Sequence, residues 1–203
     1  NGNKKMTITS TIIGVLVLAY LLGSIPFGLL FSRMGGLGDI RETGSGNIGA
    51  TNVLRSGNKF LAALTLLADA AKGSAAIFIA LEFAGFPTAY WAGLVALLGH
   101  VFPVWLGFKG GKGVAVFIGA SIVLSPLPGL SMLSVWLLVA LISQRSSLAA
   151  LIATLSVPLY MFVLGEVYGA VVVGVQVGIV YWAHRENISR LRKGKEPRIG
   201  QSA

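Results

Sequence analysis

The chain has 203 residues, of which 55% are hydrophobic and only 11% are charged, and its mean hydropathy is +0.80. A soluble domain carries about a quarter of its residues as charged groups, so this composition excludes a soluble globular domain and favours a surface that faces the bilayer. The net charge is +9, and the absence of cysteine excludes disulfides, thiolate nucleophiles and thiolate metal sites.

Seven segments are apolar enough to cross a bilayer, which takes roughly 20 residues for ~30 Å of hydrocarbon. In chain order they are about 7–31, 60–84, 88–106, 113–127, 129–143, 147–164 and 166–183. The fourth and fifth are short and are separated only by a predicted turn over Pro126–Pro128, so they would have to tilt or to thin the bilayer locally. We expect one all-α polytopic membrane domain over residues 1–203, with about seven transmembrane helices.

The cations are distributed unevenly over the two sides that seven spans would create. Thirteen of the 16 fall on the side of the 32–59 loop, the 107–112 loop, the 144–146 turn and the tail from His184. The other side receives Lys4 and Lys5. This asymmetry predicts a cytoplasmic C-terminus and an N-terminus outside. It also accounts for the net charge without a nucleic-acid partner, and we expect none.

The second predicted span contains two charged residues, Asp69 and Lys72, three positions apart on one helical face. Charges inside a membrane are costly, usually face the bundle interior and are usually paired. The sequence leaves two interpretations open with similar weight, a self-neutralising structural pair and a contribution to a functional site.

The 32–59 loop contains a glycine-rich stretch, Glu42–Arg55, in which Gly44, Gly46 and Gly49 fit the G-x-G-x-x-G pattern. A dinucleotide site also needs a preceding buried strand and a following crossover helix, and neither is predicted here. The stretch is nevertheless suited to an anion, because glycines free backbone N–H groups and a following helix N-terminus adds a favourable dipole. The candidate side-chain donors are Ser45, Asn47, Thr51, Asn52 and Arg55. A flexible connector is the alternative.

The second loop, 107–113, places Lys109 and Lys112 on either side of the pair Gly110 and Gly111. It is not a Walker A loop, because Gly113 stands where Ser or Thr is required and Leu106 stands at the first glycine position. Two lysines around a glycine pair can still form a compact cationic site for an anion. A basic loop that serves only topology is the alternative.

The third segment, 184–203, begins where the last predicted span ends. Helical spacing places His184 and Asn187 on one face and turns Glu186 away. A polybasic tail against anionic lipid would explain the Lys and Arg residues but neither His184 nor Asn187. On the predicted topology all three loops meet at the cytoplasmic face, as the residues of one site must.

Several catalytic signatures are missing from the sequence. It has neither the H-x-x-x-x-D motif of thioester-using glycerolipid acyltransferases nor a G-x-S-x-G elbow. Two His and seven scattered carboxylates predict no metal site, and we expect no cofactor. At the end of a span, His100 is more readily a hydrogen-bonded structural residue than a base.

The three loops resemble the three sequence blocks of the PlsY family. The matching stretches are Gly44–Asn52 with Arg55, Gly99–Ala115, and His184–Leu191, and the element Asp69-x-x-Lys-Gly73 is similar to that family as well. The resemblance implies a seven-helix enzyme of the bacterial inner membrane with its active site on the cytoplasmic side. It implies transfer of an acyl chain from acyl phosphate to glycerol 3-phosphate, giving lysophosphatidic acid and inorganic phosphate, without a thioester donor.

On this basis we expect Ser45, Arg55 and Lys112 to hold phosphate oxygens, and His184 and Asn187 to orient the glycerol portion. The expected substrate contacts also include Gly44, Gly46, Asn47, Thr51, Asn52, Lys109, Gly110, Gly111, Gly113 and Glu186. A phosphate oxygen of the donor is the favoured proton acceptor, with His184 as the alternative base. We expect a monomer whose partners are the two substrates and the bilayer. A transporter of phosphorylated metabolites and a non-catalytic lipid-binding scaffold are the competing classes.

Overall fold

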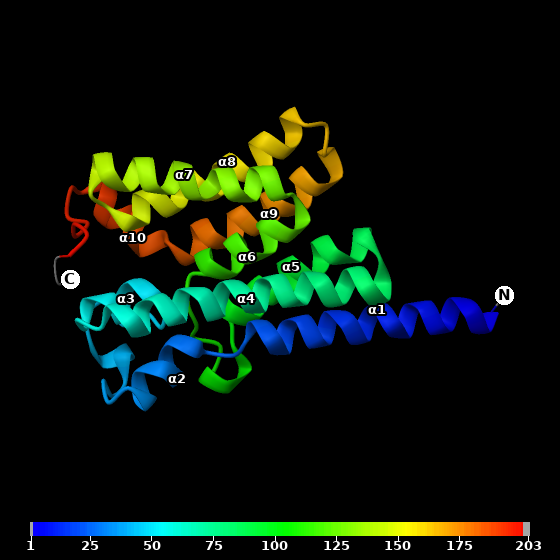
Figure 1. Ribbon diagram of the computed structural model, residues 1–203, viewed down its shortest axis with the longest axis horizontal. Helices are drawn as coiled ribbons and strands as arrows, with labels where there is room; N and C mark the ends of the chain where they lie inside the picture. The colour runs from blue at the N-terminus through cyan, green and yellow to red at the C-terminus, as the bar shows by residue number, and fades with distance from the viewer. Residues whose placement is uncertain (1, 201–203) are drawn as a thin grey trace.

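The computed structural model describes residues 2–200, with side chains from residue 8 onward, and shows helices joined by short connections (Figure 1). The helices are α1 (Gly2–Gly23), α2 (Phe27–Met34), α3 (Ala50–Arg55), α4 (Lys59–Ala84), α5 (Phe86–Val101), α6 (Val114–Leu124), α7 (Pro126–Ser143), α8 (Ser146–Val163), α9 (Val167–Ala183) and α10 (Arg185–Arg192), with 3₁₀ turns η1 (Ile40–Glu42) and η2 (Val104–Leu106). The predicted all-α class is confirmed. The side chains of Lys4 and Lys5, used to place the N-terminus, and residues 201–203 of the predicted third loop lie outside the described part.

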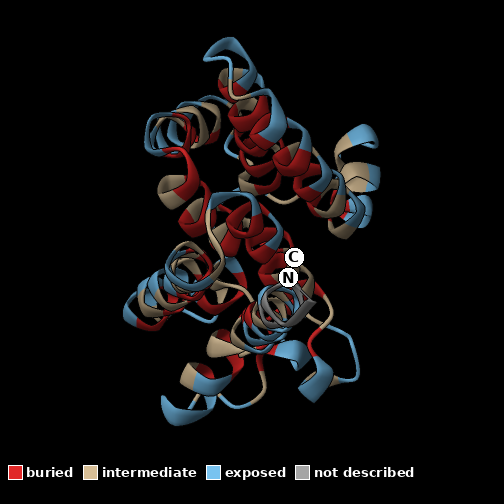
Figure 2. Cartoon of the chain, turned by 90° about the vertical axis from the view of Figure 1, so that its right-hand side faces the viewer, coloured by how far each residue is buried: buried red, intermediate tan, exposed pale blue. Residues whose placement is uncertain are grey.

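The described helices have the lengths and surfaces of a membrane protein. Within residues 2–200, five spans are long and apolar enough to cross a bilayer, and a sixth results if α9 and α10, bent by 64°, are taken together. Figure 2 shows exposed outer faces around a buried interior, and many of the exposed residues are large and apolar. Side chains exposed by 60% or more include Leu67, Phe78, Ile142, Phe162 and Val171. Such a surface is stable in lipid rather than in water.

The predicted spans differ from the observed helices at two prolines. The first span is interrupted, because α1 ends at Gly23 and α2 starts after Pro26, whose ring fixes φ and removes an N–H donor. The Pro126–Pro128 segment was predicted as a turn but forms the first turn of α7, where a proline N–H is not needed. At 11 residues α6 is only ~16 Å long, too short to cross the hydrocarbon upright, so the count of seven spans stays a prediction.

Helix α4 lies in the middle of the bundle, packed against α1, α5 and α6, while α8 packs against both α7 and α9 (Figure 1). The core between them is filled by small residues and a few large ones. The largest fully buried side chains include Ile77, Leu97, Phe117, Val157 and Val173. Because the helices approach closely only on these inner faces, the connections at one end of the bundle remain available to form a site.

A buried polar cluster ties α4 to its neighbours. The Nζ atom of Lys72 lies 2.7 Å from Oδ1 of Asp69 and 2.9 Å from Nδ1 of His100, and it donates to the Ile25 carbonyl at 2.7 Å. The side chains of Asp69 and Lys72 are 3% and 2% exposed. The ammonium group therefore joins α4, the end of α5 and the break between α1 and α2, where a carbonyl has lost its helical partner.

Replacing Lys72 should destabilise the fold strongly. Lys72→Ala leaves the Asp69 carboxylate buried without a counter-charge, and breaking such a pair costs about 3–5 kcal/mol of the free energy of unfolding. The measurement is denaturant or thermal unfolding of the protein in detergent, with Lys59→Ala, an exposed lysine of the same helix, as control. Equal stability of Lys72→Ala and the wild type would contradict this account of the cluster.

Candidate functional site

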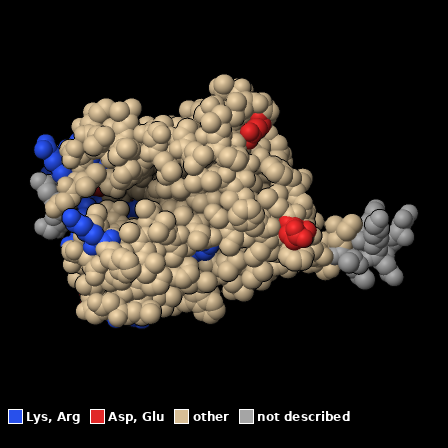
Figure 3. Space-filling model, in the orientation of Figure 1, with Lys and Arg blue, Asp and Glu red and all other residues tan. Residues whose placement is uncertain are grey.

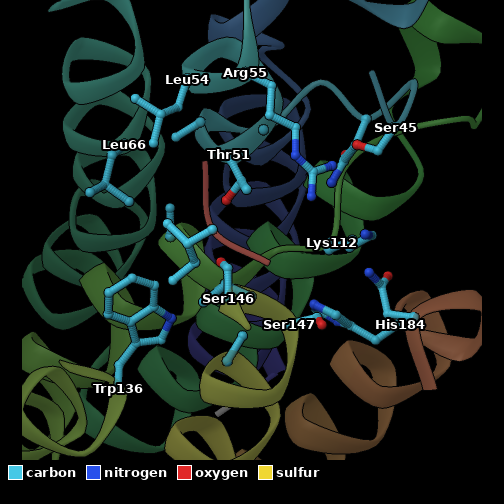
Figure 4. Close-up of a pocket in the computed structure, with 18 of the residues that line it drawn as sticks. Ser45, Thr51, Leu54, Arg55, Leu66, Lys112, Trp136, Ser146, Ser147 and His184 are labelled. Carbon is cyan, nitrogen blue, oxygen red and sulfur yellow. The ribbon is translucent and has the colours of Figure 1, made fainter. Parts of the chain in front are cut away.

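A cavity of about 510 Å³ opens at the end of the bundle where α3, α10 and the C-terminal segment meet. Figure 3 shows Lys and Arg gathered around a hollow at this end of the visible face. The polar lining includes Ser45, Thr51, Arg55, Lys112, Ser147, His184, Asn187 and Glu196. The apolar lining includes Leu54, Leu66, Ile118, Leu133 and Trp136. Figure 4 shows the labelled cationic and apolar side chains on different sides of the same space. The volume lies within the range of small-molecule sites.

Asn52 holds the glycine-rich loop in shape. Its Nδ2 donates to the carbonyls of Ile40 at 2.7 Å and Thr43 at 3.1 Å, and its Oδ1 accepts from the backbone N of Ser45 at 2.9 Å and from its Oγ at 3.3 Å. The amide of Asn52 is therefore engaged within the loop and does not line the cavity. This corrects its predicted substrate contact, because a side chain with four internal hydrogen bonds has none left for a ligand.

Other residues of the same loop divide into those that shape it and those that face the cavity. Gly44 and Gly46 adopt φ values of +56° and +67° and do not line the cavity, which corrects their predicted contact role. The structure brings together the remaining candidates, Ser45, Asn47, Thr51 and Arg55, along the cavity wall. Thr51 and Arg55 lie on α3, so this short helix places the Arg55 guanidinium group at the cavity.

The second loop contributes less of its backbone than predicted. Gly110 N–H donates to the Val101 carbonyl at 3.1 Å, and Gly111 N–H donates to the His100 carbonyl at 3.0 Å. These two amides are therefore not available to an anion, which corrects their predicted role. Gly111 is required for another reason, since a Cβ at this position would collide with the His100 ring. Lys109 is exposed outside the cavity, whereas Lys112 and Gly113 line it.

Lys112 is the most deeply placed cation in the polar lining of the cavity. Burial lowers the pKa of its ammonium group to about 8, helped by repulsion from Arg190 and Arg55 and opposed by attraction to Glu196 and Glu186. A bound anion would relieve both the repulsion and part of the desolvation cost. An anion in the pocket would therefore stabilise the charged form of Lys112, as expected of an anion site.

His184 presents a single defined nitrogen to the cavity. Its Nδ1 lies 2.8 Å from the Val180 carbonyl, and because a carbonyl can only accept, Nδ1 carries the proton and Nε2 keeps its lone pair. Burial and the nearby Lys112 lower the pKa of the imidazole to about 4, against a smaller upward effect of the Val180 hydrogen bond. At neutral pH His184 is therefore an uncharged hydrogen-bond acceptor.

Asn187 belongs to a hydrogen-bonded network that the sequence did not predict. Asn187 Nδ2 and Ser147 Oγ both donate to Glu196 Oε1, at 2.6 Å and 2.7 Å, and Arg190 Nε donates to Glu196 Oε2 at 2.7 Å. Glu196 is one of only seven acidic residues and stands in a strongly basic tail, a contrast that could have drawn attention to it. Glu186 is exposed and does not line the cavity, which corrects its predicted contact role.

Hydrogen bonding determines the charge of Glu196. Burial raises the pKa of this carboxyl group, but the hydrogen bonds from Asn187, Ser147 and Arg190 together lower it by more, so the net shift of the pKa is downward. The side chain is therefore ionised at neutral pH and partly offsets the surrounding cations. Asp69 and His100 also line the cavity, and the Nδ1 of His100 lies 2.9 Å from the Nζ of Lys72.

A family model described as glycerol-3-phosphate acyltransferase matches residues 13–194. The chain belongs to this family. Two curated members called glycerol-3-phosphate acyltransferase illustrate the similarity. The protein of Agrobacterium fabrum is 56% identical over 185 residues, covering 91% of this chain and 90% of the relative. That of Mesorhizobium japonicum is 57% identical over 192 residues, covering 95% and 98%.

Solved structures of the family agree with the fold. A crystal structure of PlsY, an integral membrane glycerol 3-phosphate acyltransferase in its glycerol 3-phosphate form, has a TM-score of 0.88 and 40% identity, covering 93% of this chain and 96% of that one. The lysophosphatidic acid form of PlsY has a TM-score of 0.86 and 38% identity, covering 92% and 94%. The resemblance to the PlsY family is thereby confirmed, and the chain is an integral membrane protein of that family.

Anion binding in this pocket should weaken in alkaline solution. Lys112 loses its charge as the pH rises through about 8, whereas a phosphate monoester such as glycerol 3-phosphate is already largely a dianion above its second pKa of about 6. The Kd for glycerol 3-phosphate should rise about tenfold between about pH 7 and pH 9, because only the charged lysine binds. Calorimetric titration of the protein in lipid nanodiscs measures this. Lys112→Arg stays charged and should lack the rise, and a Kd independent of pH in the wild type would contradict the assignment.

Proposed function

We propose that this protein transfers a fatty acyl chain from acyl phosphate to a hydroxyl group of glycerol 3-phosphate, forming lysophosphatidic acid and inorganic phosphate. Membership of the glycerol-3-phosphate acyltransferase family supports the acceptor, as do the names of its relatives and of the PlsY structures. The observation that carries the proposal furthest is one cavity with both a cationic and an apolar wall.

The two walls match the two parts of the substrates. Arg55 and Lys112 supply positive charge for phosphate oxygens, and guanidinium groups can bind them in a bidentate way. Leu54, Leu66 and Trp136 form an apolar wall suited to an acyl chain (Figure 4). A lipid-like donor can therefore place its tail among apolar groups while its phosphate lies near the cations.

The proposed reaction balances without a cofactor. The glycerol hydroxyl oxygen forms a bond to the acyl carbonyl carbon, and the bond between that carbon and the phosphate oxygen breaks. The hydroxyl proton passes to a phosphate oxygen of the donor, and phosphate leaves with the bonding electron pair. Arg55 and Lys112 would stabilise the negative charge that develops, and preorganised charges of this kind supply large rate effects.

The state of His184 favours orientation over proton removal. An imidazole with a pKa of about 4 is a weak base at neutral pH, since general bases work best when their pKa lies near the working pH. Its Nε2 lone pair can still accept a hydrogen bond from a glycerol hydroxyl, and Asn187 can do the same beside it. We therefore assign His184 and Asn187 to the acceptor, and Ser45, Arg55, Lys112 and Gly113 to phosphate. His184 as the base remains the alternative mechanism.

Acyl phosphate is the proposed donor because phosphate is itself a good leaving group that needs only positive charge. A thioester donor would call for the H-x-x-x-x-D motif, which the sequence lacks. The gathering of cations at the pocket end supports a cytoplasmic active site in the bacterial inner membrane (Figure 3). We propose that the protein acts there as a monomer, without metal, cofactor or nucleic acid.

The direct test is phosphate release by the purified protein in lipid. Palmitoyl phosphate should give inorganic phosphate only when glycerol 3-phosphate is present, with an equal amount of lysophosphatidic acid. Palmitoyl-CoA and palmitoyl acyl carrier protein, supplied in place of palmitoyl phosphate, should give no lysophosphatidic acid. Absence of release together with saturable uptake of glycerol 3-phosphate into sealed vesicles would refute the enzyme and favour a transporter.

Arg55 should be essential for turnover but not for folding. Its side chain lines the cavity rather than the core, and loss of one preorganised charged donor typically costs ~10²–10³ in rate. Arg55→Ala should therefore lower kcat/KM by about that factor while its unfolding temperature in detergent changes little. Arg33→Ala removes an exposed arginine that pairs with Asp39 outside the cavity, and should keep normal activity. Near-normal turnover by Arg55→Ala would show that the first loop has another role.

A further inference from the structure

The C-terminal segment 196–200 forms one wall of the cavity. It is attached to the connection between α7 and α8, because Ile199 N–H donates to the Gln144 carbonyl at 2.7 Å and Arg145 Nε donates to the Glu196 carbonyl at 3.4 Å. Glu196 is 6% exposed although its neighbours are mostly at the surface. It also lies beyond residues 13–194, the part matched by the family model.

The Glu196 carboxylate determines how two other side chains are oriented. Because its Oε1 can only accept, the Asn187 amide must direct Nδ2 toward it and Oδ1 away from it. The Oδ1 atom is buried and has no hydrogen-bond partner among the described residues. The hydroxyl proton of Ser147 is likewise directed to Glu196, which leaves the oxygen lone pairs of Ser147 available. A buried acceptor without a partner is costly unless a ligand satisfies it.

We infer that Glu196 is a positioning residue of the part of the site that binds glycerol 3-phosphate, the acyl acceptor. It holds the Asn187 amide and the Ser147 hydroxyl so that both present hydrogen-bond acceptors to the hydroxyl groups of glycerol 3-phosphate. This inference rests on the proposed function. Together with Nε2 of His184, these groups form a cluster of hydrogen-bond acceptors. The two hydroxyl groups of glycerol 3-phosphate are hydrogen-bond donors that match this cluster.

The charge of Glu196 also determines how glycerol 3-phosphate is oriented in the site. Its Oε2 is paired with Arg190 at 2.7 Å, and all three of its donors are supplied by the protein, so it is neither a free base nor a phosphate ligand. A carboxylate repels phosphate, whereas Arg55 and Lys112 attract it. The phosphate of glycerol 3-phosphate therefore lies toward the two cations, and its hydroxyl end lies toward Asn187 and Ser147.

A double-mutant cycle between Glu196 and Asn187 tests this role. Glu196→Ala should lower kcat/KM for glycerol 3-phosphate about 100-fold, since misplacement of a positioning group costs about that much. The KM for palmitoyl phosphate should change less than about twofold, because the donor is bound elsewhere. When Asn187→Ala is already present, Glu196→Ala should cost less than about threefold more, as expected of residues that act together.

A purely structural Glu196 would give a different pattern. Its loss would then lower activity by the same factor with and without Asn187, and would raise KM for both substrates, and this result would overturn the inference. Glu82→Gln is the matched control, since it neutralises an exposed carboxylate near the far end of α4. It should behave as the wild type.

Glu196→Gln provides the test if Glu196→Ala does not purify as a folded protein. The single oxygen of glutamine cannot accept from both Asn187 and Arg190, so Asn187 loses its fixed orientation in part of the molecules. A loss of about tenfold is therefore expected, again nearly absent on the Asn187→Ala background. Additive losses would contradict the inference. Failure of the wild type to release phosphate would overturn the proposed function and the inference with it. Normal wild-type activity that Glu196→Ala retains would overturn the inference alone.

Discussion

Phosphate groups require positive charge, and the hydrocarbon of a bilayer excludes it; the structure accommodates both conditions by placing the cavity at one end of the helical bundle. Here the connections, short helices and the C-terminal segment carry the cations, while the apolar faces of the long helices continue from the same cavity into the lipid-facing body. A site deeper in the bundle would have to desolvate Arg55 and Lys112 completely. The position at the end of the bundle lowers the free-energy cost of burying these charges.

The charged cluster inside the bundle links the fold to this site. Lys72 is surrounded by three acceptors contributed by α4, α5 and the break after α1, so its charge is satisfied without water. The ring of His100 in that cluster packs directly against Gly111, the residue before Lys112. The buried ion pair within the bundle therefore lies one residue contact away from the loop that carries Lys112, and Asp69 and His100 also line the cavity.

Hydropathy and loop chemistry predicted most of the architecture and the cationic part of the cavity. Arg55 and Lys112 were found because charge beside a predicted helix end is recognisable locally. The role of Gly111 could not be predicted, since the carbonyl that accepts from its N–H is chosen only when α5 and the loop pack together. Glu196 and Ser147 are 49 positions apart, and no periodic pattern connects them. Contacts of that kind depend on tertiary structure alone.

The wall formed by residues 196–200 affects how the protein is made. All the long apolar helices precede this segment in the chain, so they leave the ribosome before it does. Until Glu196 arrives, Arg190 and the Asn187 amide lack their shared acceptor, and the cavity stays open on that side. The apolar helices and the last wall of the site thus come from different parts of the chain, and a chain cut short before Glu196 would keep the helices but lack that wall of the pocket.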